Sequence, residues 1–164
     1  MTMERVTRAL VSGSFDPITA GHADLVERAA RMFDEVWVVV CVNASKRGRF
    51  TSEQRLEMVR AAFRNCDRVR VGLCEGLLAD YARERGITVL VRGARGSVDF
   101  DYELSMSLIN RSLNNDLDTI VLPTRAELQH VSSTMISELI KYGKDYSQYL
   151  PEGVAELISE YTIN

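Results

Sequence analysis

Short runs of β-branched and other apolar residues alternate along this chain with longer segments of helical periodicity. We predict strands at residues 8–12, 35–42, 69–73, 88–92 and 118–122. Each run is almost continuously hydrophobic, which is typical of strands buried on both faces of a parallel sheet. The alternation therefore predicts an α/β fold, with a Rossmann-like, doubly wound sheet of five parallel strands, flanking helices and right-handed crossovers.

Helical periodicity fills the segments between and after these runs. We predict helices at about residues 22–33, 52–64, 77–85, 100–113, 133–142 and from about 151 to the end of the chain. The sequence Thr51-Ser52-Glu53-Gln54 is a capping-box pattern, and Gly86 suits the position just after a helix end. Each of the first helices follows a strand, as the predicted topology requires.

Length and composition set the size of the fold. With 164 residues, of which 46% are hydrophobic, the chain is long enough for one packed α/β domain and short for two. We find no repeat, low-complexity tract or linker, so we expect a single domain over residues 1–164.

Charge and cysteine content restrict partners and compartment. The net charge of −3 gives no global basic field, so we expect neither nucleic acid nor a membrane surface as a partner. No run approaches the roughly 20 apolar residues of a membrane span. Three cysteines without C-x-x-C spacing are typical of reduced thiols, and we expect a cytoplasmic protein.

The loop after the first predicted strand, "GSFDPITAGH" (residues 13–22), has an unusual composition. Gly13 permits a tight turn and close approach of a ligand, Pro17 stiffens the loop, and His22 stands at the start of a helix. Ligands of open parallel sheets bind beyond the carboxyl ends of the strands. A helix N-terminus there offers unpaired N–H groups to phosphate, to which the His22 ring can also donate.

Cations follow two other predicted strands. Lys46, Arg47 and Arg49 come after the second strand, and Arg92 and Arg95 come with the end of the fourth. Taken singly, each feature also fits an ordinary turn, a solvated cation or a helix cap. Together, three loops at one sheet edge bring positive charge into one cleft, which indicates a site for more than one anionic group.

The loop "GSFDPITAGH" resembles the G-[TS]-F-D-P-x-T-x-G-H signature of phosphopantetheine adenylyltransferases, in the nucleotidyltransferase superfamily named for its (H/T)-x-G-H motif. The resemblance continues through "SKRGRFTSEQR", "GLLADYA", "VRGAR", "DFDYE", "MSLINRSL", "VSST" and "YLPEGV", over nearly the whole chain. It implies a nucleotidyltransferase-type fold and transfer of AMP from ATP to 4′-phosphopantetheine, the penultimate step of coenzyme A synthesis. It also implies Mg²⁺ bound with ATP, and a homohexamer.

The same resemblance implies roles for three catalytic residues. His22 would donate to the α-phosphate as charge builds up, Lys46 would lie near both reacting phosphates, and Arg92 would hold the phosphate of the acceptor. The attacking phosphate is already ionised at neutral pH, so positioning and charge neutralisation suffice without a strong general base. We assign no protein residue as a metal ligand.

Further contacts are implied by matching the remaining motifs. ATP contacts would fall on Ser14, Phe15, His22, Gly93, Ala94, Arg95, Glu103, Leu128, Gln129, His130, Val131, Ser132, Ser133 and Thr134. Contacts to the phosphopantetheine substrate would fall on Ser14, Lys46, Leu77, Leu78, Arg92, Asn110 and Glu138. Ser132 and Ser133 begin a predicted helix, so hydroxyl and N–H groups there could both face phosphate. For His130, stacking on adenine and a role in packing both stay open.

Three other functions fit this sequence less well. Adenylyltransferases that act on nicotinamide mononucleotide share the loop, but they usually carry His where Thr19 stands, and Ser137 does not fit their last helix motif either. A nucleotide-binding regulatory module would have lost the motif histidine or the loop lysine, whereas His22 and Lys46 are both present. An RNA-binding role is disfavoured by the acidic composition.

Overall fold

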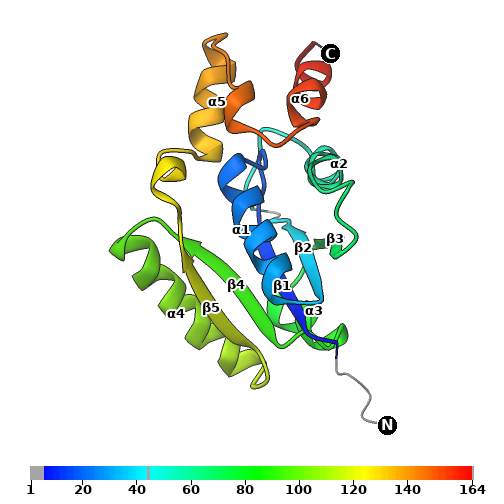
Figure 1. Ribbon diagram of the computed structural model, residues 1–164, viewed down its shortest axis with the longest axis vertical. Helices are drawn as coiled ribbons and strands as arrows, with labels where there is room; N and C mark the ends of the chain where they lie inside the picture. Colours follow the sequence, from blue (N-terminus) through cyan, green and yellow to red (C-terminus); the bar gives the residue numbers. More distant parts are fainter. Residues whose placement is uncertain (1–5, 44, 164) are drawn as a thin grey trace.

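Five parallel strands form one sheet in the computed structural model, which describes residues 6–43 and 45–163 (Figure 1). The spatial order β3-β2-β1-β4-β5 places the first strand at the centre. Successive strands are added on one side of β1 and then on the other, which confirms the predicted doubly wound topology. The strands are β1 (Arg8–Gly13), β2 (Glu35–Cys41), β3 (Val69–Cys74), β4 (Val89–Ala94) and β5 (Asp118–Pro123).

Helices cover both faces of this sheet. They are α1 (Ala20–Met32), α2 (Ser52–Ala62), α3 (Leu78–Glu84), α4 (Ser97–Leu113), α5 (Ser133–Lys141) and α6 (Val154–Ile163), with short 3₁₀ turns η1 (Ala126–Leu128) and η2 (Ser147–Tyr149). Helices α1, α2, α5 and α6 contribute to one core, and α3 to the other. Neighbouring residues of β1 divide between the two cores: Ala9 and Val11 face the first, and Leu10 faces the second.

Strand register brings the carboxyl ends of the central strands to one edge. Gly13 at the end of β1 pairs with Val40 of β2, and Gly93 of β4 pairs with Leu122 of β5. In Figure 1, α5 and α6 lie together beyond this edge, at the end of the molecule away from the N-terminus. The loops with the predicted chemistry therefore lie on the same side of the sheet.

Local signals fixed the ends of the helices. Thr51 and Gln54 form the predicted reciprocal capping box at the start of α2. Gly86 has a φ of +63°, and its N–H bonds the Arg83 carbonyl while the Ile87 N–H bonds the Ala82 carbonyl, which together make a Schellman motif after α3.

Two predicted helix starts differ from the structure by about three residues. Helix α6 begins at Val154 rather than near residue 151, because the preceding turn contains Gly153 at a φ of +82°, outside the helical region. Helix α4 begins at Ser97 rather than near residue 100, directly after Gly96 at its N-cap.

The prediction that every strand is buried on both faces is wrong for β5. None of its six residues is fully buried, and Ile120 is 37% exposed. The reason is position: β5 is an edge strand, paired with β4 along one side only. Hydrophobic composition alone does not reveal which strand lies at the edge.

Composition also predicted reduced thiols and no membrane span. Cys41, Cys66 and Cys74 are free cysteines in the structure, which confirms the first expectation. None of the helices in the described residues combines the length and the apolar character needed to cross a membrane.

We predict that Gly86→Ala lowers the free energy of unfolding by about 1 kcal/mol, because an L side chain is disfavoured at positive φ. Gly76→Ala is the matched control, since a Cβ there meets no atom within 4 Å. Urea denaturation at one protein concentration measures both. Equal stability of the two variants would contradict the Schellman assignment.

Candidate active site

A cavity of about 550 Å³ opens at the carboxyl ends of β1 and β4. Its walls come from the end of β1, the start of α1, the end of β4, the first turns of α4, the segment after β5 and the start of α5. These segments are far apart in the sequence and meet where the strand order reverses. This is the position at which doubly wound sheets bind ligands.

Thr19 and His22 form a capping box at the start of α1. The Thr19 hydroxyl accepts from the His22 backbone N–H at 3.4 Å, and the His22 ring Nδ1 accepts from the Thr19 backbone N–H at 3.0 Å. Because Nδ1 acts as an acceptor, the neutral ring carries its proton on Nε2. Thr-x-Gly-His is thus a helix start that also fixes which ring nitrogen can donate.

The pKa of His22 is lowered from 6.5 to about 4. Burial is the largest cause, and the positive charges of Arg92 and Arg95 add to it. The ring is therefore neutral at physiological pH. A neutral imidazole with its proton on Nε2 is a hydrogen-bond donor that carries no charge before an anion arrives.

Three helix N-termini meet at this cavity. Gly21 and His22 line it from α1, Val98 and Asp99 from α4, and Ser133 from α5. The first N–H groups of a helix have no acceptor within the helix, and the helix dipole puts partial positive charge there. Their convergence makes a binding site for a group with several negative charges.

Arg92 is held rigidly in the wall of the cavity. Its Nε and Nη2 donate to the two carboxylate oxygens of Glu103 at 2.8 and 2.9 Å, and its Nη1 donates to the Ser12 carbonyl and hydroxyl at 2.6 and 3.2 Å. A guanidinium has five N–H groups, so one N–H on Nη2 remains for a ligand. Glu103 thus orients Arg92, a contact that the resemblance did not suggest.

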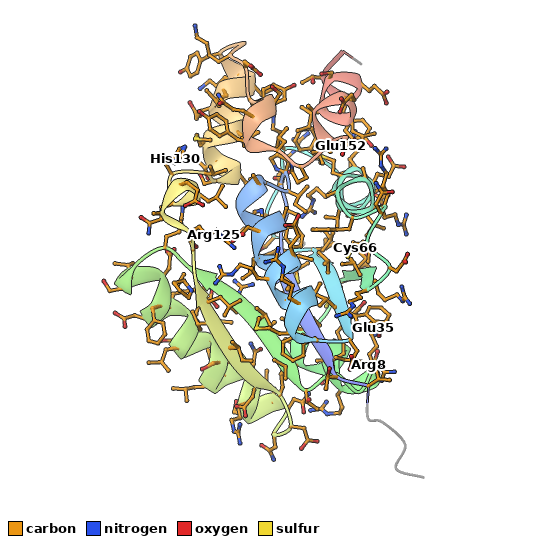
Figure 2. The ribbon with its side chains drawn as sticks, in the orientation of Figure 1. Arg8, Glu35, Cys66, Arg125, His130 and Glu152 are labelled. Atoms are coloured by element: carbon orange, nitrogen blue, oxygen red, sulfur yellow. The ribbon has the colours of Figure 1, made fainter. Side chains whose placement is uncertain are left out.

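Other cations around the cavity are also paired with carboxylates. Arg95, just before α4, donates to Asp99 in the first turn of that helix at 2.9 Å. Asp24 on α1 accepts from Arg28 at 3.4 Å and from Arg125 at 2.7 Å. Figure 2 labels Arg125, on the segment between β5 and η1 beside α1. The sequence analysis did not predict Asp24, Arg28 or Arg125 as residues near the site. Among them, only the spacing of Asp24 and Arg28, four apart on one helix, could have indicated an ion pair.

Ten of the predicted site residues line this one cavity. They are Ser14, His22, Arg92, Gly93, Arg95, Glu103, Leu128, Val131, Ser132 and Ser133. At the start of α5, the Ser132 hydroxyl caps the helix by accepting from Met135, and the Ser133 hydroxyl donates to the Pro17 carbonyl at 2.8 Å. The serine hydroxyls are thus partly engaged, and backbone N–H groups are the main donors of this helix start.

The other predicted residues lie outside the cavity lining. Phe15, Ala94 and Asn110 are buried, Leu78 is half-buried, and Lys46, Leu77, Gln129, His130, Thr134 and Glu138 are exposed. His130 lies near η1 and the start of α5 and makes an edge contact with the Tyr149 ring, with centroids 5.8 Å apart (Figure 2).

Asp16 joins the Ser14 loop to the loop that carries Lys46. Its carboxylate accepts from the backbone N–H of Arg49 at 2.8 Å and of Phe50 at 2.9 Å. Gly48 fits closely beside this carboxylate, because a Cβ there would lie 2.8 Å from an Asp16 oxygen. The second cationic loop is therefore anchored to the first.

Comparison with known proteins identifies the family of this chain. The profile of the Cytidylyltransferase-like family matches residues 10–139. A curated phosphopantetheine adenylyltransferase from Thermotoga neapolitana is 43% identical over 152 residues, which cover 93% of this chain and 94% of its own. One from Finegoldia magna is 41% identical over 154 residues, which cover 94% of this chain and 95% of its own. The relative from Symbiobacterium thermophilum has the same name and is 43% identical over 153 residues, which cover 93% of this chain and 94% of its own.

This chain belongs to the phosphopantetheine adenylyltransferase family. The membership confirms the predicted family and its class, the nucleotidyltransferases. It favours that reading over the adenylyltransferases of nicotinamide mononucleotide. Within the family's fold, the cavity described above is the one site where the motif histidine, the paired arginines and three helix starts meet in the described residues.

We predict that the His22 ring stays neutral down to about pH 5. The chain has two histidines, so His130→Gln leaves a single ring to follow by ¹⁵N NMR. Between pH 6.5 and about 4 the unfolded chain takes up a proton at His22 and the folded chain does not, so the free energy of unfolding falls as the pH drops through this window. A ring that titrates near pH 6.5 in the folded protein would contradict the assignment.

Proposed function

We propose that this protein transfers AMP from ATP to 4′-phosphopantetheine. A phosphate oxygen of the acceptor attacks the α-phosphorus of ATP, the bond from that phosphorus to the bridging oxygen breaks, and pyrophosphate leaves, giving dephospho-coenzyme A. The observation that carries the proposal is a cavity in which three helix N-termini, Arg92, Arg95 and a neutral His22 surround one space, in a member of this family. The free thiols suit the cytoplasm, where we place the reaction.

His22 would act by donating a hydrogen bond from its Nε2–H to an oxygen of the α-phosphate. Charge on that oxygen changes as pyrophosphate leaves, and a donor already held in place by Thr19 needs no reorganisation during the reaction. The acceptor phosphate is ionised at neutral pH, so His22 is not required as a base. This fits a ring whose pKa lies at about 4.

Two cations would hold the acceptor phosphate. Arg92 lines the cavity with one N–H to spare, and Lys46 lies on the loop that Asp16 anchors beside Ser14. Lys46 is exposed, so its long side chain can turn toward a phosphate bound beside Ser14. Together they would place the attacking oxygen in line with the leaving pyrophosphate.

Mg²⁺ would arrive bound to the phosphates of ATP. Within residues 6–43 and 45–163, no group of three or more His, Cys, Asp or Glu side chains is arranged to hold a metal ion. The cavity carboxylates Asp24, Asp99 and Glu103 each pair with arginine. This donor set fits a Mg²⁺ ion held mainly by phosphate oxygens and water, which would offset the charge of the triphosphate.

The outer face of α4 supports self-association, and by resemblance to the family we propose a homohexamer. Large apolar side chains along this helix and on β5 are exposed, which is more than a monomer usually shows. They are Val98, Phe100, Tyr102, Leu104, Leu108, Ile109, Leu113 and Ile120. The same helix begins at the cavity, so the proposed interface and the site share α4.

Pyrophosphate release from ATP and Mg²⁺ tests the activity, with 4′-phosphopantetheine and nicotinamide mononucleotide as separate acceptors and the adenylylated product identified by mass. We expect release only with 4′-phosphopantetheine. Release only with the mononucleotide would contradict the proposed acceptor, and no release with either despite ATP binding would contradict the activity.

His22→Ala should lower kcat by about 10²- to 10³-fold while the KM for ATP changes little, because the proposed contact strengthens in the transition state. Steady-state kinetics with both substrates measure this split. Turnover within a few fold of the wild type would rule out the role. Arg60→Ala is the control, since Arg60 is an exposed residue of α2 that does not line the cavity.

Leu108→Glu should break the assembly, because it places a charge in the middle of the exposed apolar face of α4. Light scattering after size-exclusion chromatography measures the mass. We expect six chains for the wild type and fewer for this variant. Met32→Glu, at a side chain 50% exposed on α1, is the control, and an unchanged mass for Leu108→Glu would overturn the proposed interface.

A further inference from the structure

Arg55 is a buried cation without a carboxylate partner. Its exposed fraction is 8%, and among the described residues no Asp or Glu forms an ion pair with it. A buried guanidinium is costly unless its N–H groups are satisfied. Every acceptor of Arg55 in these residues is a backbone carbonyl: Ser14 at 2.8 Å, Cys41 at 3.4 Å and Thr51 at 3.4 Å.

The shortest of these bonds fixes the orientation of one peptide group. A trans peptide is planar, with its C=O and N–H pointing in opposite directions. When Arg55 holds the Ser14 carbonyl, the Phe15 N–H must therefore point away from Arg55. Rotation of this peptide would turn the carbonyl, a hydrogen-bond acceptor, to the side where the N–H now lies.

Arg55 and the cavity lie on opposite sides of β1. Helix α2, which carries Arg55, packs on β2 and β3, whereas the cavity lies toward β4 and α4 on the other side of β1 (Figure 1). Ser14 lines the cavity. In the described parts of the chain, the Phe15 N–H has no hydrogen-bond acceptor. Phe15 is itself buried and does not line the cavity, so its N–H is an unpaired donor directly behind a residue that does.

The loop needs this support because its conformation is strained. Phe15 has a φ of +47°, in the left-handed region that bulky residues rarely adopt. Its ring is buried over Gly13 and meets the His22 ring edge-on, with centroids 5.1 Å apart. A conformation of this kind persists only where the surroundings hold it. Arg55 is the charged group that donates directly to the backbone of this loop, at the Ser14 carbonyl.

We propose that Arg55 is a positioning residue, which orients the Ser14–Phe15 peptide so that the Phe15 N–H donates to a phosphate of the nucleotide. This proposal rests on the function proposed above. Arg55 itself touches no substrate, since it is buried beneath the loop on the α2 side. A second carbonyl bond, to Cys41 at the end of β2, ties the guanidinium to the sheet and keeps it in place.

The test compares Arg55→Gln, which removes the charge, with Arg55→Lys, whose ammonium can still donate to the Ser14 carbonyl. The control is Arg60→Gln, at an exposed arginine of the same helix. Kinetics and melting temperature are measured for each. Protein labelled with ¹⁵N-phenylalanine has five such amides, among which Phe15 is followed on addition of ATP and Mg²⁺.

We expect ATP to shift the Phe15 amide in the wild type, in Arg55→Lys and in Arg60→Gln. In Arg55→Gln the shift is lost and kcat falls by about 100-fold, the cost of losing one preorganised backbone donor. A purely structural role would instead lower the melting temperature and leave kcat of the folded enzyme unchanged. If the glutamine variant does not fold, a lysine variant whose Phe15 amide shifts with ATP supports the proposal.

Three results would overturn the proposal. Arg55→Gln with wild-type kcat and a normal Phe15 shift would contradict the positioning role of Arg55 and leave the proposed function of the cavity standing. A folded lysine variant whose Phe15 amide fails to respond would do the same. If ATP shifts no phenylalanine amide and does not bind in the wild type, the function proposed for the cavity falls together with this inference.

Discussion

The reciprocal bonds between Thr19 and His22 are the interaction on which the rest of the site depends. They begin α1 directly after the loop from β1, so the helix N-terminus opens into the cavity. They also occupy Nδ1 of the ring, which leaves the proton on Nε2. Burial and two nearby arginines keep that ring uncharged. The capping motif thus sets the direction of the helix start and the tautomer of the proposed phosphate donor, while burial and the two arginines set its charge.

The remaining electrostatics of the cavity follow a single pattern. Each carboxylate in its wall is paired with arginine, as Glu103 is with Arg92 and Asp99 with Arg95. Such pairs hold the cations in fixed positions while leaving helix N-termini and single N–H groups for a ligand. The arginines and carboxylates that line the cavity are equal in number, so the site would attract a polyanion through fixed N–H donors and helix N-termini and not through an excess of side-chain charge. Arg55 departs from this pattern, because its acceptors in the described residues are backbone carbonyls, including that of Ser14.

Sequence reasoning predicted most of the fold because its signals are local. The alternation of strands and helices, the capping box at Thr51 and the turn at Gly86 each depend on a few neighbouring residues, and all three are confirmed. Burial of β5 was predicted wrongly, because edge position depends on the order of strands and not on their composition. The family followed from motifs spread over the whole chain.

The site could be predicted only in part, since many of its contacts join distant segments. The pairing of Asp24 with Arg125 and the bond from Arg55 to Ser14 cross long separations that no local pattern encodes. The positive φ of Phe15 likewise gives no sequence signal, because bulky residues rarely adopt it. Motif matching did gather ten residues around one cavity, whereas the roles given to them, and to residues outside the lining such as Lys46 and His130, stay predictions.

A crystal structure with Mg²⁺ and the ATP analogue whose α,β-bridging oxygen is replaced by methylene would test the account most directly. We expect the triphosphate among the starts of α1, α4 and α5, with His22 Nε2 and the Phe15 N–H within hydrogen-bond distance of phosphate oxygens. A nucleotide bound outside this cavity, or one whose phosphates contact neither donor, would contradict the central claim that the capped histidine and the helix starts form the phosphate site.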